Sequence, residues 1–118
     1  MTRPDLPTLR AALWAQLALV GARRALRRRG LEDVEVKRPP RLPPRARRGV
    51  VAVLRRQPHT CLERALVLQT WDAAYGNARD VVIGVAREGG DFAAHAWLAG
   101  DPDNDDSRFH ELMRLSPS

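Results

Sequence analysis

The chain is short of the residues that mark several large classes of protein. Its 118 residues include one cysteine, so no intramolecular disulfide can form and nothing indicates an oxidising compartment. The longest uncharged run, residues 11–22, is shorter than the roughly 20 apolar residues that span a bilayer. It also makes a poor signal sequence, because Asp5 precedes it and arginines follow it at once. We therefore expect a cytoplasmic protein with no membrane association.

Aromatic residues are also scarce, at 5% of the chain, whereas positive charge is abundant. The first 50 residues hold 13 Arg and Lys against 4 Asp and Glu, and the remaining 68 hold 7 against 10. Such a basic half suits nucleic acid, an acidic peptide or an acidic partner, or is simply a solvated surface. Proteins that bind nucleic acid interleave aromatic residues with basic ones, and only Trp14 lies among these charges. We therefore expect no nucleic-acid binding.

Breaker residues divide the chain into two parts. Apolar residues recur three or four positions apart and predict a helix over residues 8–29, which ends in arginines before Gly30. Residues 37–48 hold four prolines and six positive charges, which predicts an extended connector. The expected organisation is an N-terminal helix and basic connector over residues 1–49, followed by a second unit over residues 50–118. The periodic positions of the helix are Leu9, Leu13, Leu17 and Val20.

The single cysteine, Cys61, stands at the start of a second predicted helix, residues 60–74. Thr60 before it and Glu63 after it form the T-x-x-E pattern of a capping box. A thiolate at this position faces unpaired backbone N–H groups and the positive end of the helix dipole. The N–H of Cys61 is placed to face an oxyanion on an attacked carbonyl, and Gln57 is a candidate second donor. The alternative is that Cys61 is a small residue of the core.

A hairpin is predicted after this helix. Two short β-favouring runs, residues 81–86 and 92–99, flank the turn REGGD. Alternation in the second run places His95 and Trp97 on one face. The segment RFHELMRL, residues 108–115, is a closing element to which the pattern gives no type. Helices together with a short antiparallel hairpin predict an α+β fold.

Three histidines are candidates for the base that a cysteine nucleophile needs. His59 comes two residues before Cys61, on the wrong side of the cap to face it. His110 has no strand pattern around it. His95 stands between alanines in a predicted strand, which leaves room for a substrate chain. We therefore predict His95 as the base, against the alternative of an ordinary structural histidine.

An acidic, turn-rich loop follows the hairpin and contains Asp101, Asp103, Asp105 and Asp106. One of these carboxylates is a candidate to orient the imidazole, and the alternative is a solvated turn. A calcium-binding EF-hand loop needs Gly at its sixth position and Glu at its twelfth, where this loop has Asp106 and Leu112. One cysteine with scattered histidines gives no zinc spacing either. We expect no metal and no cofactor.

Taken in order, these motifs resemble the transglutaminase-like cysteine peptidases of lasso-peptide biosynthesis. That family has a CL-x-RAL helix, a V-I-G-V strand, an F-x-AHAW strand and an Asn-Asp pair, in this order. In this chain the four motifs begin at Cys61, Val82, Phe92 and Asn104, and they fall within residues 57–109.

The resemblance implies a transglutaminase- or papain-like core, in which the cysteine helix packs on a small antiparallel sheet behind an N-terminal helix. It implies a catalytic triad of Cys61, His95 and Asp105. Asp103 and Asp106 are alternative third members, because the Asn-Asp pair lies nearer the histidine than the family pattern has it. The chain also departs from the pattern in having an alanine where the family usually has a Glu shortly after the tryptophan.

The activity implied is a cysteine endopeptidase that removes the leader from a ribosomally made precursor peptide. Family members either carry a fused leader-binding domain or stand alone and act with a separate small leader-binding protein, a RiPP recognition element. This chain resembles the stand-alone form, with residues 1–49 as a docking region. The partners implied are the precursor leader and the leader-binding protein, with the lasso cyclase as a further candidate. The rival functions are a transglutaminase-like acyltransferase or amidase on the same triad, and a non-catalytic basic binding module.

Overall fold

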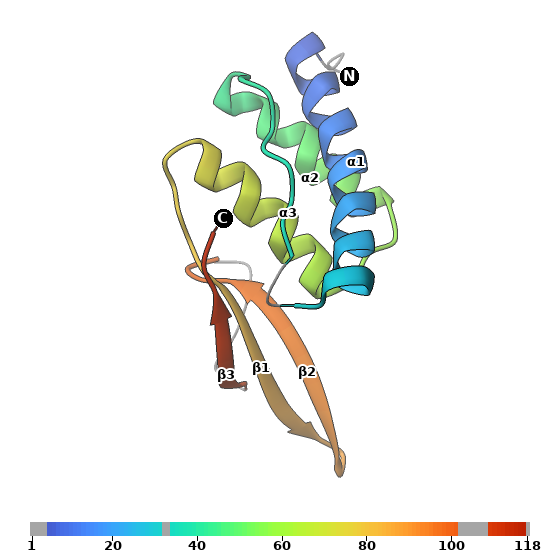
Figure 1. Ribbon diagram of the computed structural model, residues 1–118, viewed down its shortest axis with the longest axis vertical. Coiled ribbons are helices and arrows are strands. Elements are labelled where there is room, and N and C mark those ends of the chain that lie inside the picture. The colour runs from blue at the N-terminus through green and yellow to red at the C-terminus, as the bar shows by residue number, and fades with distance from the viewer. Residues whose placement is uncertain (1–4, 32–33, 102–108, 118) are drawn as a thin grey trace.

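The helices gather at one end of the molecule, and a small antiparallel sheet extends away from them (Figure 1). The computed structural model describes residues 5–31, 34–101 and 109–117, and this part of the chain forms three α-helices, a short 3-10 helix and three strands. The α+β class expected from the sequence is confirmed. None of the described helices combines the length and the hydrophobicity that a bilayer-spanning segment requires.

Local signals mark both ends of α1 (Leu6–Arg29). The Asp5 side chain accepts a 2.9 Å hydrogen bond from the backbone N–H of Thr8, which caps the first turn. Arginines fill the last turn, where they face the negative end of the helix dipole, and Gly30 ends the helix with a φ of 79°. The helix predicted over residues 8–29 is present and begins slightly earlier.

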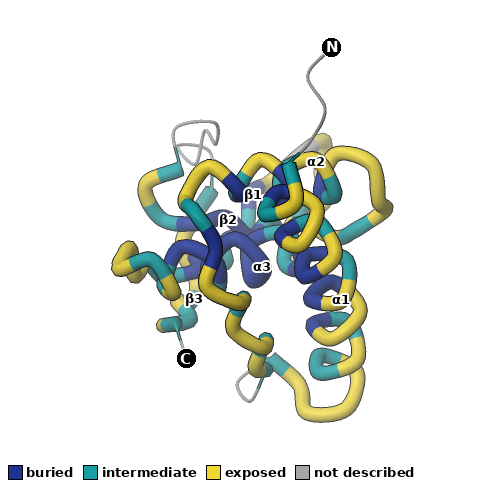
Figure 2. Tube along the Cα trace, turned by 90° about the horizontal axis from the view of Figure 1, so that it is seen from above, coloured by how far each residue is buried: buried dark blue, intermediate teal, exposed yellow. Residues whose placement is uncertain are grey.

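α1 turns its small residues, rather than its regularly spaced leucines, toward the core. Leu13 and Leu17, which helped to predict the helix, are 62% and 63% exposed. The buried face consists mainly of alanines around Trp14, and these short side chains allow α2 (Arg47–Arg56) and α3 (Cys61–Ala74) to approach closely. Figure 2 shows the contrast between the buried and exposed sides of α1. The buried residues are Thr8, Ala11, Trp14, Ala15, Ala18, Leu19 and Ala22.

The chain between α1 and α3 contains a helix that the sequence pattern did not predict. Residues 34–43 are extended, but the second proline pair then starts a 3-10 turn, η1 (Pro44–Ala46), which runs directly into α2. The extended connector predicted over residues 37–48 is therefore wrong from Pro44 onward. Proline is tolerated at the first position of a helix, because the N–H group that it lacks would have no acceptor within the helix.

α1 and α2 cross at a glycine. A Cβ at Gly49 would lie 2.2 Å from the backbone O of Thr8 and 3.0 Å from the backbone N of Ala12. These are backbone atoms, which cannot rotate away as the end of a flexible side chain can. The absence of a side chain at residue 49 therefore sets how closely the two helices approach.

α3 begins where the sequence predicts and lies in the middle of the molecule (Figure 2). Oγ1 of Thr60 accepts a 3.1 Å hydrogen bond from the N–H of Glu63, and the Glu63 carboxylate accepts a 3.0 Å bond from the N–H of Thr60. The predicted capping box is confirmed. The five consecutive residues 65–69 are buried, and because a helix turns by about 100° per residue they point in every direction. α3 is thus enclosed by the other elements.

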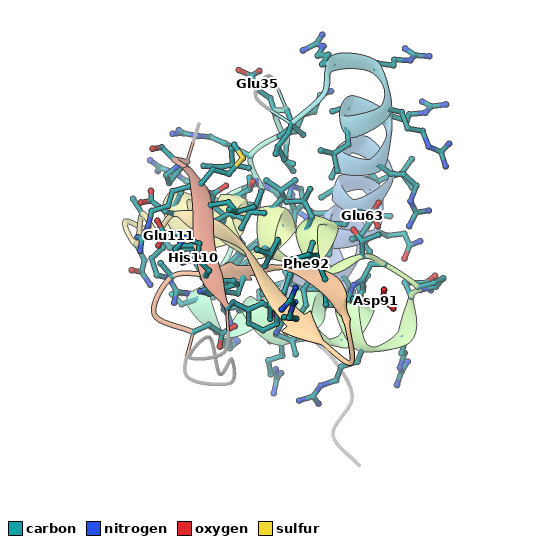
Figure 3. The ribbon with its side chains drawn as sticks, turned by 90° about the horizontal axis from the view of Figure 1, so that it is seen from below. Glu35, Glu63, Asp91, Phe92, His110 and Glu111 are labelled. Carbon is teal, nitrogen blue, oxygen red and sulfur yellow. The ribbon has the colours of Figure 1, made fainter. Side chains whose placement is uncertain are left out.

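An ion pair ties the start of α3 to α1. Nε and Nη2 of Arg23 lie 3.2 Å and 3.3 Å from the two carboxylate oxygens of Glu63, and Nη2 also donates to the backbone O of Pro58 at 3.1 Å. Figure 3 shows Glu63 beside α1. Burial by itself would raise the pKa of Glu63, but the hydrogen bonds from Arg23 and Thr60 outweigh it and hold that pKa below its ordinary value.

The sheet has the order β2-β1-β3 and is antiparallel throughout. β1 (Val81–Glu88) and β2 (Asp91–Leu98) form the predicted hairpin. Gly89 and Gly90 make its turn with φ values of 56° and 92°, the left-handed backbone that a tight two-residue hairpin turn requires. The closing element is a strand, β3 (His110–Leu115), which pairs with the other side of β1.

One hydrophobic core joins the N-terminal helix to the rest of the protein. It contains side chains from α1, α2, α3 and the sheet. At its centre, the ring of Trp71 on α3 lies 5.7 Å from that of Trp14 and 4.8 Å from that of Tyr75. The boundary expected between residues 49 and 50 falls within α2, and core side chains lie on both sides of it.

The crossing of α1 and α2 predicts opposite effects for two glycine substitutions. Gly49→Ala should lower the free energy of unfolding by about 1–3 kcal/mol, because the added methyl group overlaps backbone atoms of α1. Gly21→Ala is the matched control in an open part of α1, where no atom lies within 4 Å of the added Cβ. It should raise stability by about 0.5–1 kcal/mol through helix propensity. Urea unfolding measures both, and equal midpoints would contradict the close crossing.

The ion pair at the start of α3 predicts a stability difference that depends on pH. Glu63→Gln keeps an oxygen to accept from Thr60 but removes the charge that faces Arg23, so it should cost about 1–2 kcal/mol at pH 7, allowing for the solvent around the half-exposed arginine. Because the folded-state pKa of Glu63 is lowered, its contribution is present above the ordinary value of 4.5 and is lost as the pH falls through the folded value.

The stabilities of wild type and Glu63→Gln should therefore converge on acidification from pH 7 toward pH 3, as measured by urea unfolding. Glu35→Gln, a change at an exposed position outside this contact, is the control and should follow the wild type throughout. A difference between Glu63→Gln and wild type that stayed constant over the whole pH range would show that the ion pair does not act as described.

Candidate active site

The thiol of Cys61 lies against β2. Cys61 is the first residue of α3, and its Sγ accepts a hydrogen bond of 3.4 Å from the backbone N–H of Ala96. Ala96 directly follows His95 along the strand, so this contact brings the predicted nucleophile beside the segment that carries the predicted base. The thiol is half-buried, and it also packs against the border of the core.

The contact is made at an edge of the sheet. β2 pairs with β1 on one side, and no described strand pairs with its other side. The N–H of Ala96 is directed at the sulfur instead of a neighbouring strand, and the start of α3 lies close to β2 (Figure 1). The backbone N–H of Ala96 thus reaches the sulfur from the strand edge, and Cys61 itself stands at the end of α3 where backbone N–H groups lack partners within the helix.

The ring of His95 is held in a cluster of aromatic rings. It stacks on Trp97, with ring centres 5.8 Å apart and planes at 21°, and the ring of Phe109 lies 5.1 Å away. Trp97 in turn covers Gly84 on β1, where a Cβ would lie 3.0 Å from the indole. Gly84 therefore provides the space for Trp97, and Trp97 supports the imidazole.

Strand alternation places the imidazole on the sheet face away from the helices. Ala96 and Leu98 belong to the core beneath the helices, so His95 and Trp97 share the other face, as the alternating pattern predicts. The thiol of Cys61 meets β2 at the edge of the strand that no other described strand covers.

The candidate acids Asp103, Asp105 and Asp106 lie outside the described residues. The residues on either side of that segment are described, and both are attached to the site. Asp101 pairs with Arg64, one turn along α3 from the cysteine, at 3.6 Å. Phe109 contacts the rings of His95 and Trp97, at 5.1 Å and 5.8 Å respectively. The described residues that flank this segment thus lie beside α3 on one side and against the imidazole on the other.

The other sequence candidates occupy different surroundings. Both ring nitrogens of His59 face backbone carbonyl oxygens, Nε2 at 2.6 Å from Leu54 and Nδ1 at 3.1 Å from Thr60, so this ring fastens the turn before α3. His110 is exposed on β3, at the opposite edge of the sheet from β2, as Figure 3 shows. Contrary to the sequence analysis, it stands in a strand. Gln57 is exposed at the end of α2.

Several residues of the site could not be predicted from the spacing of the cysteine, the histidines and the aspartates in the sequence. Arg23 and Phe109 come from segments far from Cys61 in sequence. The donor at Ala96 is a backbone group. Gly84 gave the one indirect signal, since a glycine within a strand often marks a close approach of another group. Within the part of the chain that the structure describes, no three His, Cys, Asp or Glu side chains gather as a metal site would require.

This arrangement suits chemistry at a cysteine sulfur. The nucleophile stands at a capped helix start, its sulfur accepts from the N–H of Ala96, and the imidazole of the preceding residue belongs to the same strand. Acyl transfer through a thioester needs these groups: a sulfur nucleophile, a proton acceptor and N–H donors for the oxyanion.

Comparison with known proteins agrees with this chemistry. The model of the transglutaminase-like superfamily matches residues 6–114, which extend from the start of α1 into β3. No curated protein and no solved structure matches the chain. The matched residues include the three helices, nearly all of the sheet and Cys61 at the start of α3, so these elements belong to one family domain. The chain belongs to the transglutaminase-like superfamily.

Proposed function

We propose that this protein is a cysteine endopeptidase that removes the leader from a lasso-peptide precursor. The observation that carries the proposal is the contact between Cys61 Sγ and the N–H of Ala96, which joins the capped start of α3 to the strand of His95. The superfamily supports cysteine chemistry. The finer assignment rests on the ordered motifs CL-x-RAL, V-I-G-V and F-x-AHAW.

In the proposed reaction His95 takes the proton of Cys61, and the sulfur attacks the carbonyl carbon of the peptide bond between leader and core. The N–H of Cys61 holds the oxyanion, with Gln57 proposed as the second donor. His95 then gives its proton to the leaving amine of the core peptide, and a thioester to the leader remains. Water, deprotonated by His95, hydrolyses the thioester and releases the leader with a free carboxylate.

The third member of the triad is proposed to be Asp105, with Asp103 and Asp106 as alternatives. A carboxylate beside the imidazole fixes its tautomer and stabilises the imidazolium that forms. The attachments of Asp101 to Arg64 and of Phe109 to His95 support this choice of segment, because they hold both of its flanks at the site.

The leader is proposed to be presented by a separate leader-binding protein that docks on the N-terminal part of the chain, with the lasso cyclase as a further partner. The position of α1 supports this. Its inner face belongs to the core and Arg23 reaches the start of α3, so a partner bound to α1 stands on the same rigid unit as the cysteine.

Replacement of the nucleophile gives the first test. The precursor peptide, the leader-binding protein and the wild-type chain are incubated together, and the products are identified by mass spectrometry. Free leader with an unmodified C-terminal carboxylate is expected, and Cys61→Ala should lower its rate of formation by at least about 1,000-fold. A new amide between the leader and an added amine would indicate an acyltransferase instead. Cleavage that persists in Cys61→Ala would refute the proposal.

The two strand histidines give a matched pair for the base. His95→Ala should reduce the cleavage rate by about 100-fold or more, because proton transfer to and from the reacting groups is lost. His110→Ala, on the opposite edge of the sheet, should cleave at the wild-type rate. Circular dichroism checks that both variants are folded. Similar losses in the two variants would show that the ring of His95 has no special part in the reaction.

A further inference from the structure

α1 carries an apolar stripe that no described part of the chain covers. Five side chains spaced three or four residues apart form this leucine stripe, and they are between 44% and 70% exposed. The opposite face of α1 belongs to the core, so the helix is apolar on both sides. A contiguous exposed apolar surface of this kind marks a contact site. The stripe consists of Leu6, Leu9, Leu13, Leu17 and Val20.

The stripe continues into a groove between the C-terminal half of α1 and the extended residues 34–38. The groove has a volume of about 620 Å³, and Leu17, Val20 and Val36 contribute to its apolar lining. Nε1 of Trp14 donates a 3.0 Å hydrogen bond to the backbone O of Lys37, which fastens the extended segment alongside the helix. The groove is therefore held open by a fixed wall on each side.

Positive charge surrounds this apolar surface. The 24 residues of α1 include six arginines and no acidic residue. Of these arginines, Arg23 is engaged with Glu63 within the protein. Among the described residues that line the groove only Glu35 is acidic, and Figure 3 shows it on the segment opposite α1. The basic residues that line the groove are Arg24, Arg28, Arg29, Lys37 and Arg38.

We propose that the leucine stripe and this basic groove bind an acidic amphipathic helix of a partner protein. Spacings of three and four residues form a straight seam on one side of a helix, against which a second helix packs with apolar residues at the same spacing. From Leu6 to Val20 the seam is about 21 Å long, which matches a partner helix of about four turns. Acidic residues beside the partner's seam would meet the arginines of α1.

Charge and shape favour this occupant over three others. A second copy of the same surface would bring two sets of arginines together, at a cost in repulsion. Nucleic acid would neutralise the arginines, but the stripe is aliphatic, and Trp14, the aromatic residue among the described lining of the groove, is only 8% exposed, which leaves little ring surface on which bases could stack. An anionic membrane is flat, whereas this surface is hollowed between α1 and residues 34–38. The inference rests on the proposed function in its choice of face, since a leader-binding protein is proposed to dock on the same part of the chain. It uses none of the residues assigned to catalysis, and peptide binding is measured without cleavage, so the two proposals can fail separately.

The test uses the full chain and a fluorescein-labelled synthetic peptide of three heptads, with Leu at alternating three- and four-residue spacing and Glu at the flanking positions. Fluorescence anisotropy should show binding that weakens as salt is raised, because salt screens the charges. The double variant Leu13→Gln/Leu17→Gln should weaken binding about tenfold or more, through loss of the apolar contact. Leu112→Gln is the matched control, since Leu112 on β3 is exposed to the same degree, 61% against 62% for Leu13.

A second pair of variants tests the contribution of the groove arginines to peptide binding. Arg24→Gln/Arg28→Gln should weaken peptide binding and flatten its salt dependence, whereas Arg55→Gln/Arg56→Gln, at the exposed end of α2, should leave both unchanged. Circular dichroism confirms folding of every variant.

Four results would overturn the proposal. The first is equal binding of a peptide with Lys in place of Glu, or of one with the same composition in scrambled order. The second is tighter binding of a 20-nucleotide single-stranded DNA than of the peptide, lost in the Arg24→Gln/Arg28→Gln variant. The third is binding to phosphatidylserine-phosphatidylcholine vesicles, lost in Leu13→Gln/Leu17→Gln, in place of peptide binding. The fourth is self-association of the wild type that the same leucine variant abolishes, as sedimentation velocity would show.

Discussion

The capped start of α3 is the constraint on which the candidate site depends. Cys61 is the first residue of that helix, so the contacts that hold the first turn in place also set the direction of its thiol. Thr60 and Glu63 close that turn locally, and Arg23 holds both Glu63 and the carbonyl of Pro58 from α1. Glu63 is only 4% exposed, and a buried carboxylate is costly without a partner, which makes the arginine necessary to the buried position of this residue. The cap, the ion pair and the thiol therefore form one unit.

The same dependence on other elements extends along α3, because its buried polar side chains bind several other parts of the fold. Glu63 is bound by α1. Gln69 donates to the backbone O of Arg79 at 3.0 Å and to that of Leu115 in β3 at 2.8 Å. Asp72 is bound by Arg47 of α2, with Nε 3.0 Å from its oxygen, and by Arg79, whose backbone O accepts from Gln69. An apolar α3 would bury equally well against several neighbours, whereas these polar groups are satisfied in one arrangement only. α3 thus specifies where the surrounding elements lie, and with them the strand that faces Cys61.

The parts of the fold that the sequence predicted are those encoded by neighbouring residues. The capping box of Thr60 and Glu63 and the Gly89–Gly90 turn are local, and both are present as expected. The missed parts depend on distant contacts. No spacing rule joins Arg23 to Glu63, 40 residues apart. β3 is a strand because β1 pairs with it, and α2 follows a proline pair that suits a helix start as well as a connector. For the site, the sequence indicated Cys61 and His95, but the sulfur's contact with a backbone N–H becomes visible only once the strand is in place.

The two faces of α1 explain why periodicity identified the helix but not the face that packs. Leucine spacing is the usual sign of a core-facing stripe. Small residues face inward where α1 crosses α2, because Gly49 lies against the backbone of Thr8 and Ala12 and leaves no room for a larger side chain at that point. The small residues pack against the other helices, and the leucines are left on the outside of α1. Their exposed apolar surface is unfavourable in water and does not stabilise the folded chain. Exposed leucines between arginines are therefore better explained by a contact with another molecule than by the folding of this one.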